Sequence, residues 1–86
     1  MIRVKVLLFA SLAQRAGVRE VGLDLPFKST VADALAAAAE RYPGLGAVEE
    51  VGSAGVATAV NLGYVPRSTV LADGDELALI PPVSGG

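Results

Sequence analysis

The sequence predicts an α+β roll in which one main helix crosses a mixed sheet and a flexible tail follows at the C-terminus. The chain combines short strand-like segments of period two with one long amphipathic helical segment. Its 86 residues, of which 52% are hydrophobic, are enough for one compact core and exclude a disordered chain. We therefore predict a single domain over residues 1–80 and an extended tail over residues 81–86.

The N-terminal part of the chain predicts a hairpin whose two strands are joined by a short helix. Residues 2–9 form an apolar run in which alternate positions share one strand face. Residues 12–16 favour a short helix that Ser11 caps and Gly17 ends. Residues 19–25 alternate apolar and polar side chains, which is typical of a strand with one buried face.

Residues 31–42 form the strongest helical segment of the sequence. Thr30 and Asp33 have the spacing of a capping box, with aspartate in place of the usual glutamate. A run of four alanines gives the segment a high helix propensity. Pro43 and Gly44 end the helix. The predicted apolar stripe consists of Val31, Leu35, Ala38, Ala39 and Tyr42.

The C-terminal part predicts several short strands around one central strand. Residues 45–55 are rich in glycine and predict a loop with at most one helical turn. Residues 56–60 predict a short strand, and a return strand starts at residues 64–65. After a tight turn, residues 76–80 are nearly all apolar, as a central strand is. This order of elements, with the last strand beside the first, is that of a β-grasp, ubiquitin-like roll.

Charge and residue types exclude several classes of function. A net charge of −2 and scattered basic residues provide no electrostatic reason to bind nucleic acid or an anionic membrane. The absence of cysteine and histidine excludes disulfides, thiol nucleophiles, imidazole bases and the usual zinc sites. The chain opens on a strand-like segment rather than a signal peptide, and no apolar run is long enough to span a membrane. We expect a cytoplasmic protein without a bound metal.

No cluster inside the chain predicts catalysis. Asp73, Asp75 and Glu76 are the densest carboxylates, but a calcium site needs more oxygen ligands, so a polar turn is the better interpretation. The two glycines of residues 52–55 lack the following lysine of a phosphate-binding loop. Chemistry is therefore expected at the C-terminus.

The C-terminal tail is either a frayed end or a segment built to enter a partner, and its residues favour the second. A proline pair favours an extended, preformed segment that loses little entropy on docking. Six extended residues reach about 20 Å. Glycines have no side chain and can thread a narrow channel. The tail residues are Pro81, Pro82, Val83, Ser84, Gly85 and Gly86.

Three blocks of the sequence resemble the MoaD family, the small sulfur-carrier subunits of molybdopterin synthase within the ThiS/MoaD ubiquitin-like superfamily. The blocks are Ala-Val-Asn at residues 59–61, Asp-Gly-Asp-Glu at 73–76 and Pro-Pro-Val-Ser-Gly-Gly at 81–86. The opening residues up to Phe9 and Ala10 fit the first strand of that family, whereas residues 45–55 match poorly.

The resemblance implies a sulfur-transfer cycle centred on the carboxylate of Gly86. An E1-like, ATP-using partner of the MoeB type adenylates this carboxylate, and a sulfur donor converts it to a thiocarboxylate. The tail then enters a large subunit of the MoaE type, in a heterotetramer, where cyclic pyranopterin monophosphate takes up sulfur during molybdenum cofactor biosynthesis. The chain itself would be the non-catalytic subunit and bind no cofactor, because ATP and the sulfur donor are used through the activating partner.

The resemblance also implies a partner interface at Phe9, Tyr64 and Ile80. Tyr64 and Ile80 depart from the more usual leucine and phenylalanine but stay large and apolar, and the alternative is that all three are core residues. Other functions stay open at this point. The chain could carry sulfur for thiamine, cysteine or tungsten-cofactor pathways, act as a ubiquitin-like modifier joined to lysines through Gly86, or be an interaction domain with an inert tail.

Overall fold

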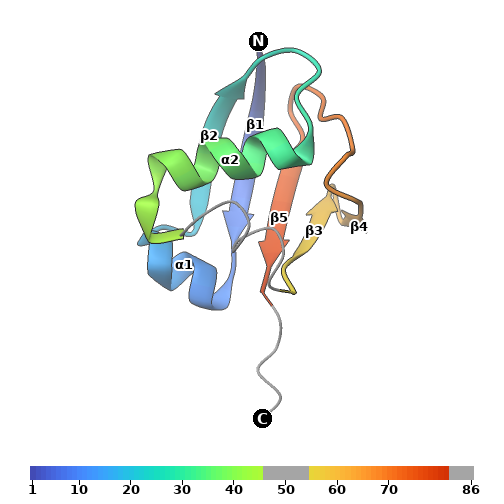
Figure 1. The fold of residues 1–86 in the computed structure, drawn as a ribbon. Coiled ribbons are helices and arrows are strands. Elements are labelled where there is room, and N and C mark those ends of the chain that lie inside the picture. Colours follow the sequence, from blue (N-terminus) through green and yellow to red (C-terminus); the bar gives the residue numbers. More distant parts are fainter. Residues whose placement is uncertain (46–54, 82–86) are drawn as a thin grey trace.

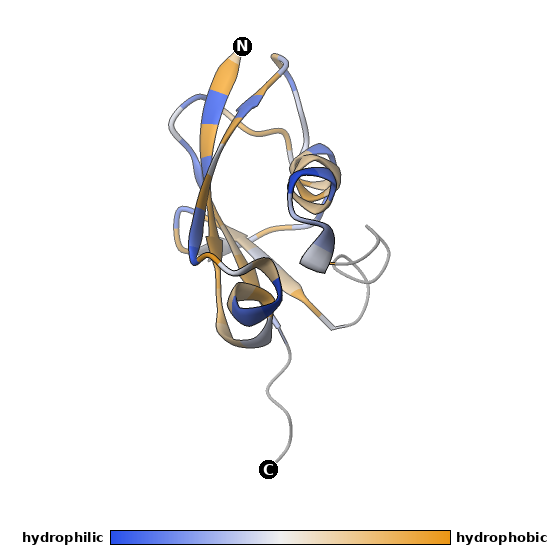
Figure 2. Cartoon of the chain, turned by 90° about the vertical axis from the view of Figure 1, so that its left-hand side faces the viewer, coloured by the Kyte–Doolittle hydropathy of each residue, from blue (hydrophilic) through white to orange (hydrophobic). Residues whose placement is uncertain are grey.

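The computed structural model describes residues 1–45 and 55–81, which form one mixed sheet with helices on one of its faces (Figures 1 and 2). Its strands are β1 (Ile2–Leu8), β2 (Glu20–Leu25), β3 (Ala57–Val60), β4 (Gly63–Tyr64) and β5 (Glu76–Ile80), and its helices are α1 (Ala10–Ala16), α2 (Val31–Arg41) and the 3₁₀ helix η1 (Pro43–Leu45). The sheet order is β2-β1-β5-β3-β4. The predicted β-grasp roll is therefore confirmed. Residues 46–54 of the predicted loop at 45–55, and residues 82–86 of the tail, lie outside the described residues.

The centre of the sheet is made by the first and last strands. β1 runs antiparallel to β2 and parallel to β5, and β3 pairs antiparallel with the other side of β5. The predicted alternation in β1 is confirmed, since Ile2, Val4, Val6 and Leu8 are buried beneath the helices. β5 matches the predicted residues 76–80 and occupies the predicted central position.

Helix α2 crosses the sheet and begins where the sequence predicts. The Thr30 side chain accepts from the Asp33 backbone N–H, and the Asp33 carboxylate accepts from the Thr30 backbone N–H, so the capping box is confirmed. The predicted stripe is partly wrong, because Ala39 is only half-buried, whereas the half-buried Tyr42 does pack against the core. The helix ends at Arg41, and Tyr42 leaves it with φ −124° and ψ 85°. The fully buried face of the helix consists of Val31, Ala34, Leu35 and Ala38.

The predicted cap of the first helix is wrong, although its end is confirmed. Helix α1 begins at Ala10 with Phe9 at the N-cap position, and no side chain caps it. Strand β1 runs almost directly into the helix, so Ser11 already lies within the first turn and is too late to act as a cap. Gly17 ends the helix in the left-handed conformation with φ 78°.

The segment after α2 contributes to the core, which the sequence prediction of a loop starting at residue 45 did not include. Leu45 is completely buried and belongs to the main hydrophobic cluster. Gly44 brings this segment against α1, because its carbonyl accepts a hydrogen bond of 3.0 Å from Arg15 Nε. A Cβ atom at Gly44 would lie only 1.9 Å from the backbone oxygen of Arg15. The close approach therefore requires glycine.

We predict that Gly44→Ala lowers the free energy of unfolding by about 2–3 kcal/mol, since the added methyl group meets rigid backbone rather than a flexible side chain. Gly63→Ala is the matched control, because the nearest atom to its new Cβ is 3.7 Å away. The control should stay within about 0.5 kcal/mol of the parent protein. Urea denaturation of both variants measures the difference, and equal losses would contradict the packing argument.

Candidate functional site

The sheet face opposite the helices is not covered by any other described element, and Figure 2 shows the helices on one side only. Residues directly paired across neighbouring strands point to the same face. The register therefore places one continuous row across all five strands on this open face. That row consists of Glu20, Leu7, Ala78, Ala59 and Tyr64.

The open face is apolar on its half nearest the end of β5. Ile80 pairs with Ala57, and each lies two residues along its strand from Ala78 and Ala59 of the row, so both point to the same face. Phe9 keeps extended backbone angles two residues after Leu7, so its side chain follows that of Leu7. We name this surface the apolar face, and it consists of Leu7, Phe9, Ala57, Ala59, Tyr64, Ala78 and Ile80. Ala59 is itself buried within it.

The structure therefore brings the three predicted interface residues to one face. Phe9 is 44% exposed and Tyr64 is 76% exposed, so the core interpretation is wrong for both side chains. Ile80 is half-buried. Exposed apolar side chains gathered on one side of a small domain are typical of a partner interface.

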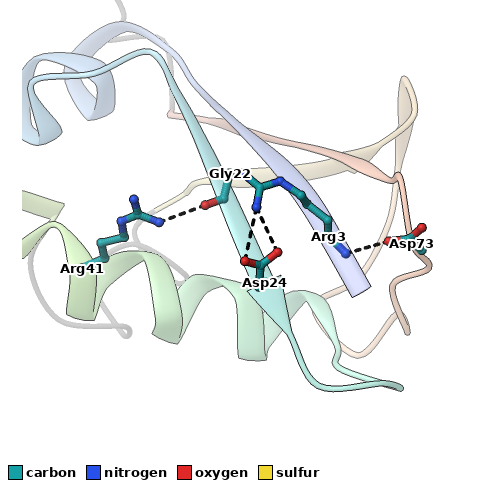
Figure 3. A network of polar contacts seen from close by, with 5 residues as sticks. All are labelled: Arg3, Gly22, Asp24, Arg41 and Asp73. Carbon is teal, nitrogen blue, oxygen red and sulfur yellow. Dashed lines mark hydrogen bonds and ion pairs between the residues drawn. The ribbon is translucent and has the colours of Figure 1, made fainter. Parts of the chain in front are cut away.

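The other half of the open face is polar and consists of two exposed ion pairs. Arg3 Nη1 lies 3.0 Å from a carboxylate oxygen of Asp24, and Lys5 Nζ lies 3.2 Å from Glu20. Figure 3 shows the Arg3 guanidinium lying across the strand at Gly22, where a Cβ would come within 2.7 Å of Arg3 Nη2. Such exposed pairs add little stability, but they give the apolar face a charged border.

The Asp-Gly-Asp-Glu block holds two turns together. The Asp75 carboxylate accepts from the backbone N–H of Ala72 at 2.8 Å and from Asn61 Nδ2 at 3.0 Å. Asn61 Oδ1 in turn accepts from the backbone N–H of Glu76 at 3.1 Å. At the start of the block, the Asp73 carboxylate accepts from the Arg3 backbone N–H at 2.8 Å, as Figure 3 shows.

These contacts confirm the predicted polar turn. Within residues 1–45 and 55–81, no cluster of three acidic side chains is arranged to hold a metal ion. The block instead fixes the tip of the β3–β4 hairpin against the start of β5. Two of the three blocks on which the family resemblance rests therefore contribute to the structure rather than to chemistry.

We predict that Asp75→Ala lowers the free energy of unfolding by about 1–2 kcal/mol, because two hydrogen bonds to a charged acceptor are lost. Asp24→Ala is the matched control, since among residues 1–45 and 55–81 its carboxylate is engaged in the exposed ion pair with Arg3 alone. Its loss should stay below about 0.5 kcal/mol. Thermal unfolding of the two variants makes the comparison. A larger effect at Asp24 would argue against a stabilising role for the hydrogen bonds of Asp75.

The apolar face lies beside the point where the tail begins. Ile80 ends β5, and the half-buried Pro81 is the last residue described. The other predicted tail residues, Pro82, Val83, Ser84, Gly85 and Gly86, lie outside the described residues, so their assigned roles stay predictions.

Sequence reasoning missed the small and central residues of the apolar face. Leu7, Ala57, Ala59 and Ala78 come together only through the pairing of three different strands, β1, β3 and β5. The period-two pattern of β1 does place Leu7 opposite the buried positions, which is the one signal that could have identified it.

Within the described parts of the chain, no helix has the length and apolar character needed to cross a membrane.

Comparisons with known proteins agree with this arrangement. A model of the ThiS family matches residues 6–86. The molybdopterin synthase sulfur carrier subunit of Arabidopsis thaliana is 40% identical over 85 residues, covering 99% of this chain and 84% of the relative. The crystal structure of SAMP1 from Haloferax volcanii has a TM-score of 0.88 at 37% identity, covering 98% of this chain and 99% of that one.

One similar structure includes a second protein. It is the complex of subunits 1 and 2 of the molybdopterin-converting factor from Helicobacter pylori 26695. The matching chain has a TM-score of 0.67 and 27% identity, covering 99% of this chain and 100% of that one. A relative with this fold therefore forms a complex with a different subunit.

Proposed function

This chain belongs to the ThiS family and is a sulfur carrier, and from that premise we propose that it is the small subunit of a molybdopterin synthase. It is the non-catalytic subunit, and in this proposal the end of its chain bears the sulfur. The observation that carries the proposal is the apolar face beside the start of the C-terminal tail, which ends in Gly-Gly. Phe9 and Tyr64 are exposed on this face.

The chemistry of the proposal starts from the Gly86 carboxylate. A carboxylate is a poor electrophile, so an activating enzyme joins it to the AMP part of ATP and releases pyrophosphate, which divides one difficult exchange into two easier steps. A sulfur donor at the oxidation level of sulfide then attacks the acyl carbon and displaces AMP. The product is a terminal thiocarboxylate. Because the chain has no cysteine, a thiol cannot take this role.

The partners supply what the chain lacks. In this proposal an E1-like adenylyltransferase provides the ATP site, and a large subunit takes up the loaded tail and holds cyclic pyranopterin monophosphate. The two-subunit complex from Helicobacter pylori supports a large-subunit partner of this kind. The chain itself binds no cofactor and works in the cytoplasm, as a heterotetramer with the large subunit.

Intact-mass spectrometry tests the proposal directly. The chain is incubated with its activating enzyme, ATP and sulfide, and the expected product has one oxygen of the Gly86 carboxylate replaced by sulfur. Omitting ATP is the control and should prevent the exchange. Adding the large subunit with cyclic pyranopterin monophosphate should then return the chain to its original mass. An unchanged mass with an active enzyme and ATP would refute the sulfur-carrier chemistry.

A protein modifier is the second candidate function. The similarity to SAMP1, whose full name is small archaeal modifier protein 1, favours it. That structure has a higher TM-score than the Helicobacter pylori chain, at 0.88 against 0.67. A modifier would be joined through Gly86 to lysines of other proteins. Peptide mass spectrometry of cells that express a tagged chain would detect such isopeptide bonds. Isopeptide-linked products without sulfur transfer to the pterin would replace the first proposal with this one.

A further inference from the structure

Leu62 has the highest exposed fraction, 98%, among the large apolar side chains of the described residues. It lies in the two-residue turn between β3 and β4, where both Asn61 and Leu62 have positive φ, 49° and 74°. This is the pattern of a type I′ turn, which favours asparagine followed by glycine. Asn61 fits its position. Leucine does not fit the second, because a Cβ atom is crowded in the left-handed region.

The folded chain gains little from leucine at this position. A side chain that is 98% exposed buries almost no apolar surface, so it adds almost no hydrophobic stabilisation. Glycine would relieve the backbone and remove an apolar group from water at the same time. A leucine here is unfavourable for the described chain alone, and it is useful only in a contact with another molecule.

The turn presents Leu62 on a rigid support. The Asn61 backbone N–H donates to Glu76 O at 2.9 Å, and the Asn61 side chain bonds Asp75 and the Glu76 N–H. On the other side of the hairpin, Thr58 Oγ1 donates to Val65 O at 2.6 Å. An anchor held in this way loses little conformational entropy on binding, which favours affinity.

The position of the turn indicates which molecule it meets. Leu62 is two residues from Tyr64, which lies on the apolar face, so the Cα atoms of the two residues are at most about 7 Å apart. A standard protein interface covers about 800 Å² on each partner. A protein docked over Tyr64 therefore also reaches Leu62. Permanent subunit interfaces are larger and more apolar than transient ones, so the large subunit fits this extension better than the activating enzyme does.

We propose that Leu62 is an anchor for the large subunit and fills an apolar pocket at the border of that subunit's docking surface. The proposal rests on the proposed function, and it extends the apolar face of this chain to the tip of the β3–β4 hairpin. The face, the rigid turn and the unfavourable leucine then have one explanation. Compared with glycine at position 62, leucine makes the isolated chain less stable and makes the complex with the large subunit bind more tightly.

The test uses Leu62→Gly together with Lys28→Gly as a matched control. Lys28 is also an exposed residue with positive φ, 70°, in the loop between β2 and α2. Both variants should raise the thermal unfolding midpoint, because both remove a Cβ atom from the left-handed region. In isothermal titration with the large subunit, Leu62→Gly should bind at least tenfold more weakly, and Lys28→Gly should bind as tightly as the parent.

Several outcomes would overturn the inference. Unchanged affinity of Leu62→Gly, in a system where the parent chain loads sulfur and binds the large subunit, refutes the anchor and leaves the proposed function standing. A clear drop in the unfolding midpoint of Leu62→Gly would assign leucine to the fold instead. Concentration-dependent dimers of the parent that Leu62→Gly abolishes in sedimentation would assign it to a second copy of this chain. Failure of the parent itself to load or bind would count against the proposed function.

Discussion

Deletion of Gly86 should reduce sulfur loading below detection while leaving thermal stability almost unchanged. The deletion still ends in a glycine carboxylate, at Gly85, but it withdraws the reacting group by about 3.5 Å. Misplacement of a reacting group by about 1 Å can already cost a hundredfold in rate. The described buried core lies between Ile2 and Leu79. Terminal residues generally contribute little to a fold, so we expect the domain to stay folded without Gly86.

Intact-mass spectrometry with the activating enzyme measures the loading, and circular dichroism measures the unfolding midpoint. Ser84→Ala is the control, because it changes a tail side chain and keeps the length and the terminal carboxylate. It should load like the parent. Normal loading of the shortened chain would show that the position of the carboxylate is not critical. A large loss of stability would make the tail part of the core.

Tyr64→Glu should weaken binding of the large subunit by at least a hundredfold and change the free energy of unfolding by less than about 1 kcal/mol. Aromatic residues at the centre of an interface commonly contribute 2 kcal/mol or more, and a buried unpaired carboxylate adds a further penalty. In the isolated chain the side chain is 76% exposed, so a charge there remains in water.

Phe27→Glu provides a closely matched control for this prediction. Phe27 is an aromatic residue with 75% exposure, and it lies in the loop between β2 and α2, away from the apolar face. The same change of charge there should leave the affinity unchanged. Equal weakening by both variants would mean that net charge, rather than the apolar face, controls binding.

The sequence predicted the fold well wherever the decisive signal was local. The alternation in β1, the capping box of α2 and the apolar run of β5 each depend on neighbouring residues, and all three are confirmed. The errors concern relations between elements. Ser11 was predicted as a cap, but the preceding strand moved the start of the helix. The burial of Leu45 depends on a close contact of Gly44 with α1, which no local pattern encodes.

The candidate site was predictable only in part, for the same reason. The resemblance identified Phe9 and Tyr64, and the structure exposes both. The alanines of the apolar face could not be identified, because a small residue has no facial preference until the strands are in register. The hydrogen bond between the Asn61 and Asp75 side chains joins residues that are 14 positions apart, so it forms only when β3 and β5 are paired.

The central position of β5 has a mechanical consequence if, as we propose, the tail is inserted into a partner and withdrawn again. A pull on the tail enters the fold through β5, which is bonded to β1 on one side and to β3 on the other. The ladder bonds lie across the direction of the pull, so they are sheared together rather than opened one after another. A force on the end of the chain therefore loads the β5–β1 and β5–β3 pairings at the same time, so the carrier can be withdrawn from a partner without unfolding from its C-terminal strand.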